Sequence, residues 1–187
     1  MTETIISVFL GVGLAASAGF RVFLPLFALS LASYLQWWEL NETWAWVGSL
    51  PALITLGVAM LAEIFAYYVP FVDNLLDTLA IPLAAVAGTA VMVSTMAGLD
   101  PVVTWALAII AGGGTATAIK GASSATRLTS SVKTAGLGNP VVATVETGSS
   151  AVMSVLSFVL PVLAFVLVVG ILVFLVWLFK KLRIRKA

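Results

Sequence analysis

The chain has 187 residues, of which 61% are hydrophobic and only 9% are charged, and its mean hydropathy is +1.16. Soluble domains carry roughly 25% charged and about 45–50% apolar residues, and a soluble globule of this size could not bury so much apolar surface. The composition therefore argues against a soluble enzyme or a nucleic-acid-binding protein and predicts a lipid surrounding. The sequence contains no histidine and no cysteine, so catalysis, disulfides and zinc or haem ligation through these side chains are excluded.

The first apolar stretch has the length of a signal peptide but lacks its basic start. Residues 1–4 contain no Lys or Arg, and the apolar sequence resumes after Arg21, so we expect a retained membrane helix rather than a cleaved leader. Residues 4–35 are longer than one straight span requires. Gly19, Arg21 and Pro25 therefore predict that this first helix tilts, kinks or breaks near them.

The apolar segments predict an all-α fold, a polytopic bundle of about six transmembrane helices that forms one domain over residues 1–187. A span needs about 20 mostly apolar residues. The predicted spans are residues 4–35, 49–69, 78–99, 101–119, 140–158 and 160–179. Because only Pro161 separates the last two, the alternative for residues 140–179 is a re-entrant segment followed by one long helix.

Charged residues in the predicted loops indicate which side of the membrane each loop faces. Residues 36–48 contain Glu39, Glu42 and several tryptophans but no basic residue. Every Lys and Arg except Arg21 lies within residues 120–133 or 180–186, and six spans place both segments on one face. The positive-inside rule makes that face cytoplasmic, so both termini are predicted to be cytoplasmic. The second basic segment is either a site for anionic lipid or a plain stop-transfer anchor.

Three spans followed by three more would place the two halves of the chain in opposite orientations, as in the 3+3 inverted repeats of transporters. Charged residues agree roughly with this division. Arg21 in the first predicted span corresponds to Lys120 and Arg127 after the fourth, and Glu63 in the second corresponds to Glu146 in the fifth. In such folds broken or re-entrant helices meet near the membrane midplane, where the substrate binds. The alternative is a chance similarity among small residues that pack helices closely.

Arg21, Glu63 and Glu146 are the ionisable residues predicted to lie within the membrane. A charge at the centre of a membrane helix costs about 2.5–3.5 kcal/mol on insertion scales, so it usually faces the bundle interior and has a partner. One interpretation is a structural ion pair, Arg21–Glu63 or Arg21–Glu146. The other is a binding site where Arg21 contacts an anion or lipid headgroup and a carboxylate carries a proton or cation. A helix break beside Gly19 would also free backbone amides that can bind an anion.

Asp73 and Asp77 occupy positions i and i+4 at the start of the third predicted span, so their carboxylates would share one helix face. Two oxygen ligands suit Mg²⁺ or Ca²⁺. Metal-dependent lipid transferases use such pairs, but they need more acidic ligands than these two. A cation or proton site is one interpretation, and helix capping is the other. Asp100 followed by Pro101 predicts a further N-cap.

Asn139 and Pro140 open the fifth predicted span after a glycine-rich helix end. The polar residues that follow are Thr144, Glu146, Thr147, Ser149 and Ser150. So many hydroxyl groups in an apolar helix predict either polar contacts between helices or the wall of a wet cavity. The candidate substrate-binding residues are Arg21, Glu63, Asn139, Glu146 and Thr147, and the candidate cation or proton ligands are Asp73 and Asp77.

Three blocks of the sequence carry a resemblance to a known family. They are GLAASAGFRVFLPL at residues 13–26, DNLLD at residues 73–77 and NPVVATVETG at residues 139–148. Together they resemble a family of small bacterial membrane proteins called a domain of unknown function (four-one-two-six). The resemblance covers nearly the whole chain and implies one membrane domain in the inner (plasma) membrane. It implies no reaction and lends no catalytic residues, but it marks the three blocks as the places to look for a site.

These features predict a transporter, flippase or channel for a small anion or an anionic lipid headgroup, working without a cofactor. The first alternative is a non-catalytic membrane scaffold or assembly protein. The second is a Mg²⁺-dependent intramembrane enzyme that acts on a lipid through Asp73 and Asp77, which the lack of a second aspartate cluster disfavours. The expected partners are the lipid bilayer and a small anion or lipid phosphate, not nucleic acid. A chain this short is also expected to form a homodimer that encloses a pathway.

Overall fold

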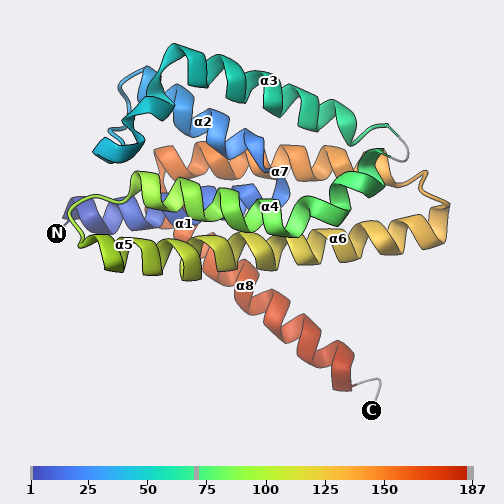
Figure 1. The fold of residues 1–187 in the computed structure, drawn as a ribbon. Coiled ribbons are helices and arrows are strands. Elements are labelled where there is room, and N and C mark those ends of the chain that lie inside the picture. The colour runs from blue at the N-terminus through green and yellow to red at the C-terminus, as the bar shows by residue number, and fades with distance from the viewer. Residues whose placement is uncertain (1, 70–71, 185–187) are drawn as a thin grey trace.

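The computed structural model describes residues 2–69 and 72–184, and this part of the chain is helical without any β-strand (Figure 1). In chain order the helices are α1 (Thr2–Phe20), α2 (Phe23–Tyr34), the 3-10 helix η1 (Glu42–Gly48), α3 (Leu50–Ala66), α4 (Val72–Thr95), α5 (Pro101–Leu107), the π-helical segment η2 (Ala108–Gly113), α6 (Gly114–Thr134), α7 (Asn139–Val159) and α8 (Pro161–Ile184). Five helices in the described ranges are long and apolar enough to cross a membrane, or six if η1 and α3 count as one bent span. The predicted all-α bundle is confirmed.

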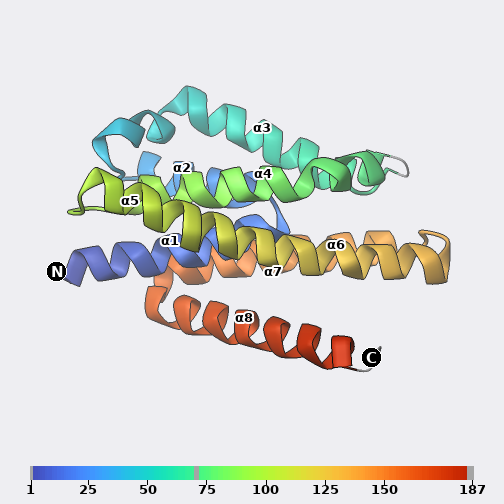
Figure 2. The same ribbon diagram turned by 60° about the horizontal axis from the view of Figure 1, so that its bottom comes forward.

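Helix α1 lies at the centre of the bundle, and α4, α6, α7 and α8 pack around it (Figure 2). Residues 10–19 of α1 are all buried. A Cβ atom added at Gly11 would lie 2.8 Å from Thr95 Oγ1, and one added at Gly19 would lie 2.7 Å from the Cβ of Ile119. Glycine therefore lets α4 and α6 approach the backbone of α1, which is the packing role that small residues have in lipid.

The first apolar stretch forms two helices rather than one span. Helix α1 ends at Phe20, and α2 begins at Phe23 and runs back toward the end of the bundle where α1 starts (Figures 1 and 2). The break predicted near Arg21 is therefore present, and it reverses the chain. Because α2 has only 12 residues, about 18 Å of helix, it is too short to cross a membrane.

The fourth predicted span, residues 101–119, ends too early. The structure has a continuous run of helix over Pro101–Thr134, 34 residues long, in which α5, η2 and α6 follow one another. Residues 120–133 were expected to form a cytoplasmic loop because they carry basic residues, but they lie within α6. That expectation was wrong because Lys120 and Arg127 are buried in the bundle instead of facing water.

The boundary between the last two helices falls at Pro161, as predicted. Helix α7 ends at Val159, α8 begins at Pro161, and the chain reverses direction between them (Figures 1 and 2). Residues 140–179 are thus two separate helices and not a re-entrant segment before one long helix. Helix α8 has a mean hydropathy of 3.2 over its most apolar window, of which only 11% is buried, so most of its surface is suited to lipid.

The start of α1 and the end of α8 lie at opposite ends of the bundle's long axis in both views (Figures 1 and 2). One end of the bundle contains the start of α1 and the loop that carries Glu39 and Glu42. The opposite end of the bundle contains the last turns of α6 and α8, which carry Lys133 and Lys180. This arrangement follows from the reversal at Arg21, because α2 brings the chain back to the end from which α1 started. The 3+3 inverted repeat stays a prediction.

Candidate functional site

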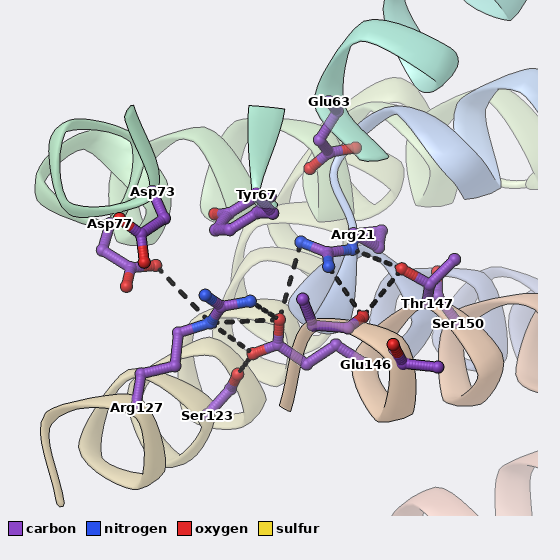
Figure 3. Close-up of polar contacts among 12 residues, drawn as sticks. Arg21, Glu63, Tyr67, Asp73, Asp77, Ser123, Arg127, Glu146, Thr147 and Ser150 are labelled. Carbon is purple, nitrogen blue, oxygen red and sulfur yellow. Dashed lines mark hydrogen bonds and ion pairs between the residues drawn. The ribbon is translucent and has the colours of Figure 1, made fainter. Parts of the chain in front are cut away.

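A buried group of charged side chains lies where the break between α1 and α2 faces α3, α4, α6 and α7 (Figure 3). The largest fully buried side chains described are those of Arg21, Arg127 and Lys120, each at most 1% exposed. We call the group the charged cluster. Its members are Arg21, Glu63, Tyr67, Asp77, Lys120, Ser123, Arg127, Glu146 and Thr147.

Arg21 contacts α7 through three atoms of its guanidinium group (Figure 3). Its Nε donates to Thr147 Oγ1 at 2.9 Å, and its Nη2 donates to the carbonyl of Ala143 at 2.8 Å. Its Nη1 lies 3.5 Å from Glu146 Oε2 but has no hydrogen-bond partner among the described residues. Of the two ion pairs considered from the sequence, the structure thus contains Arg21–Glu146.

Glu63 binds the freed backbone amides at the helix break. Its Oε1 accepts from the N–H of Val22 at 2.8 Å, and its Oε2 accepts from the N–H of Phe23 at 2.9 Å. These amides are at the start of α2, where the helix dipole favours negative charge. The anion that occupies the freed amides at the break is therefore the carboxylate of Glu63 itself. These hydrogen bonds connect α3 to the start of α2.

Glu146 is held mainly by α6. Arg127 Nε donates to both carboxylate oxygens, at 3.1 and 3.2 Å, and Arg127 Nη2 and Ser123 Oγ also donate to the carboxylate. The remaining nitrogen of this guanidinium group, Nη1, is buried without a hydrogen-bond partner in residues 2–69 and 72–184. Asp77 adds a weaker contact, with its Oδ1 4.0 Å from Arg127 Nε. One buried carboxylate therefore serves two buried arginines.

Tyr67 brings the three buried cations together. The Cζ atoms of Arg21 and Arg127 lie 4.1 and 4.3 Å from the centre of its ring, and the Nζ of Lys120 lies 5.1 Å from it. The electron-rich face of an aromatic ring attracts cations, which offsets part of their mutual repulsion. Lys120 Nζ also donates to Tyr67 Oη at 3.3 Å. Tyr67 lies in the turn after α3, where burial raises the pKa of its hydroxyl, so the phenol stays neutral.

Asp73 and Asp77 have different partners, although they share one face of α4. Asn139 Nδ2 donates to Asp73 Oδ2 at 3.1 Å and to Ser131 Oγ at 3.0 Å, whereas Asp77 faces Arg127. Asn139 thus connects the starts of α4 and α7 to α6. No group of three or more acidic side chains in the described part of the chain is arranged to hold a metal ion, and the cation or proton role of the two aspartates stays a prediction.

Asp100 is the predicted N-cap of α5. Its carboxylate accepts from the N–H of Val102 at 2.8 Å, and Pro101 occupies the first helical position. This interpretation is confirmed.

The hydroxyl groups of α7 mostly join it to other helices. Thr147 binds Arg21. Ser17 Oγ on α1 lies 2.7 Å from both Ser150 Oγ and Ser154 Oγ. Of the two interpretations of this polar helix, polar contact between helices accounts for Thr147 and Ser150.

An apolar pocket adjoins the charged cluster between α6, α7 and α8. It has a volume of about 360 Å³, and we call it the α6–α8 pocket. Its wall contains Phe20, Ile119, Ala122, Ser123, Thr126, Val141, Val142, Val145, Glu146, Ile171 and Leu175. The pocket therefore reaches the same carboxylate that Arg127 and Arg21 hold.

Four members of the cluster were not expected from the sequence to belong to a site, namely Tyr67, Lys120, Ser123 and Arg127. Lys120, Ser123 and Arg127 are spaced i, i+3 and i+7, which places them on one face of a helix. That spacing could have indicated a shared helix face, but residues 120–133 were expected to form a loop, where the spacing has no such meaning. Tyr67 carried no signal of its own, because its role depends on cations from two distant segments, the break after α1 and helix α6.

Comparison with known proteins places the chain in a family. The family model described as domain of unknown function (DUF4126) matches residues 8–181. No curated protein and no solved structure matches the chain. Because the match extends over far more than half of the chain, the protein belongs to the DUF4126 family.

Proposed function

We propose that this protein is a membrane transport protein, a transporter, flippase or channel, which moves a small anion or an anionic headgroup through the charged cluster. The observation that supports this proposal is that Arg21 Nη1 and Arg127 Nη1 are both buried without a hydrogen-bond partner in the described ranges. A buried donor without a partner is costly, and ionisable residues within membranes usually mark a substrate pathway.

An oxyanion is the ligand that fits these free donors. Guanidinium groups bind carboxylate and phosphate oxygens through parallel N–H groups. Lys120 adds a third buried cation, and its ammonium has three donors but one hydrogen bond within the described residues. An incoming anion can thus gain hydrogen bonds from three cations that already lie around one tyrosine ring.

Glu146 is the proposed coupling group. Its carboxylate binds the same arginines that an incoming anion would bind, so the two compete. Protonation of Glu146, or its displacement by the anion, would free the Arg127 guanidinium group from its hydrogen bonds to the carboxylate and remove the ion pair of Arg21. Glu63 is bound to the amides of α2 instead, and we assign it a structural role.

We further propose that the protein lies in the bacterial inner membrane and that the end of the bundle that contains Lys133 and the last turn of α8 faces the cytoplasm. Basic residues mark that side, and the opposite end carries Glu39, Glu42 and tryptophans in its loop. The start of α1 would then lie outside. This differs from the expectation that both termini are cytoplasmic, because that expectation counted residues 4–35 as one crossing. A homodimer also stays a proposal, to be tested by the mass of the purified protein in nanodiscs.

The scaffold protein is the second candidate function. It is favoured by the hydrogen bonds of Arg21 to α7, since a purely structural arginine would join helices in the same way. No observation favours the Mg²⁺-dependent enzyme, because Asp73 and Asp77 have different partners.

Flux measurements on purified protein in liposomes test the proposal. Chloride, inorganic phosphate and a fluorescent phosphatidylglycerol would be followed in vesicles with the native protein, with Arg127→Gln and without protein. We expect the native protein to move at least one of them and Arg127→Gln to abolish that movement. The control is Lys133→Gln, which removes the same charge from an exposed position of α6. If the native protein moves none of the three, the scaffold is the better conclusion.

A further inference from the structure

We propose that the substrate is an anionic phospholipid, whose phosphate binds Arg21 and Arg127 while one acyl chain lies in the α6–α8 pocket. This inference rests on the proposed transport function and names its substrate class. It is carried by the fact that a charged site and an apolar pocket share one wall, formed by Glu146 and Ser123.

The pocket lies at the side of the bundle because α8 diverges from it. The first half of α8 packs on α1, where Phe165 stacks on Phe9 with ring centres 4.4 Å apart and Val168 is fully buried. Further along, α8 leaves the other helices (Figure 1), and Ile171 and Leu175 line the pocket from that side. The opening therefore faces the region that lipid tails occupy around a membrane bundle.

The wall of the pocket distinguishes a lipid from a free anion. Apart from Ser123, Thr126 and Glu146, its residues are apolar, and its volume of about 360 Å³ lies within the range of about 300–1,000 Å³ that ligand pockets have. Beyond these three side chains, a hydrated anion would find no polar groups along such a wall. A lipid tail would pass from one apolar environment to another, so only the headgroup would have to leave water.

The charged cluster supplies what the headgroup needs. A phosphodiester carries one negative charge and two free oxygens, and it requires donors to replace its water. Arg21 Nη1 and Arg127 Nη1 are buried donors without partners in the described part of the chain. The carboxylate of Glu146 lies between the pocket and these donors, so the phosphate would take its place between the two arginines.

A matched pair of alanine variants tests the pocket. Ala122 lines the α6–α8 pocket, whereas Ala125, on the same helix, is exposed and does not line it. Ala122→Phe should fill the pocket, exclude the acyl chain from it and slow transfer of fluorescent phosphatidylglycerol in vesicles by roughly tenfold, which corresponds to about 1.4 kcal/mol. Ala125→Phe should leave transfer unchanged. Equal transfer rates in the two variants would overturn the inference.

The substrates of the assay separate this inference from the proposed function. Phosphatidylglycerol would be compared with glycerol 3-phosphate and inorganic phosphate, which share its anionic group but have no tail. We expect transfer of the lipid alone. Transfer of the soluble phosphates alone would overturn the lipid inference and support anion transport, and transfer of none would overturn both. If Ala122→Phe fails to insert, Val145→Phe fills the pocket from α7 and is judged by the same readout.

Discussion

Glu146 is the residue on which the charge balance of the cluster depends, because it is paired with both Arg127 and Arg21. Glu146→Gln should lower the free energy of unfolding by about 3–5 kcal/mol, since it removes the paired carboxylate of Arg21 and leaves Arg127 only its weaker contact with Asp77. Added phosphatidylglycerol should recover much of the lost stability, because its phosphate binds the guanidinium groups that the substitution leaves unpaired. Thermal unfolding in micelles with phosphatidylglycerol or phosphatidylcholine measures both effects.

The matched control is Glu63→Gln. Glu63 caps the start of α2 through Val22 and Phe23, and loss of a cap costs about 0.5–2 kcal/mol. An added lipid cannot replace a side chain in that position, so phosphatidylglycerol should not restore its stability. Equal recovery of the two variants would contradict the assignment of different roles to the two glutamates.

Two substitutions of Tyr67 separate the contribution of its aromatic ring to stability from the contribution of its hydrogen bond with Lys120. Tyr67→Phe keeps the ring that faces Arg21 and Arg127 but loses the hydroxyl that Lys120 contacts, and it should cost about 1 kcal/mol. Tyr67→Leu removes the ring as well, and its additional cost should be about 1–2 kcal/mol. The midpoints of thermal unfolding compare the two variants, and equal midpoints would show that the ring does not hold the cations.

At this scale the sequence predicted Arg21, Glu63 and Glu146 better than it predicted Lys120 and Arg127. The first three lie within predicted membrane spans, so their burial can be inferred from insertion cost. Lys120 and Arg127 lie among Ser, Thr, Gly and Ala, a composition that suits a loop as well as a helix packed against polar partners. Their burial depends on Tyr67 and Glu146, which are distant in the chain, and no local pattern predicts that contact.

Among the elements, the π-helical segment η2 lies between α5 and α6 and carries no charge. Its Gly112 faces α4 so closely that a Cβ there would lie 2.5 Å from the carbonyl oxygen of Gly88. A π-helical turn contains one residue more than an α-helical turn. Such a segment accommodates one extra residue within a single turn. The residues before and after it therefore keep the rotation about the helix axis that buries one face of α5 and one face of α6.

Deleting one residue tests this view of η2. Deletion of Ile110, which is 75% exposed, should convert η2 to α-helix and leave a folded protein. Deletion of Ala118 in α6 should rotate the following residues by about 100° about the helix axis, which turns Lys120 and Arg127 away from Tyr67. The fraction of monodisperse protein on size-exclusion chromatography compares the two. If both deletions are equally harmful, η2 does not act as a local adjustment.

The break between α1 and α2 was predictable as a kink but not as a reversal. Gly19, Arg21 and Pro25 weaken a helix wherever they occur. The direction of the chain after the break is determined by Glu63, which binds the first amides of α2, and by packing of α2 on α3. Neither contact can be inferred from residues 4–35 alone.

At the scale of the whole molecule, the two ends of the bundle differ in charge, and this predicts its orientation. Because the sequence contains no cysteine, single cysteines can be labelled without background. In intact cells, Glu3→Cys and Glu39→Cys should react with a membrane-impermeant maleimide, and Lys181→Cys should react only after permeabilisation. Protection of Glu3→Cys in intact cells would instead favour two cytoplasmic termini.

The central position of α1 has a consequence for biosynthesis. Arg21 leaves the ribosome well before its partners on α7, since Thr147 follows it by 126 residues. At about 5–20 residues per second, that interval is on the order of ten seconds, during which the guanidinium group has no partner on α7. Helix α1 is synthesised first, but the helices that bury it are synthesised later. We therefore expect α1 to stay in contact with the insertion machinery until those helices have been inserted.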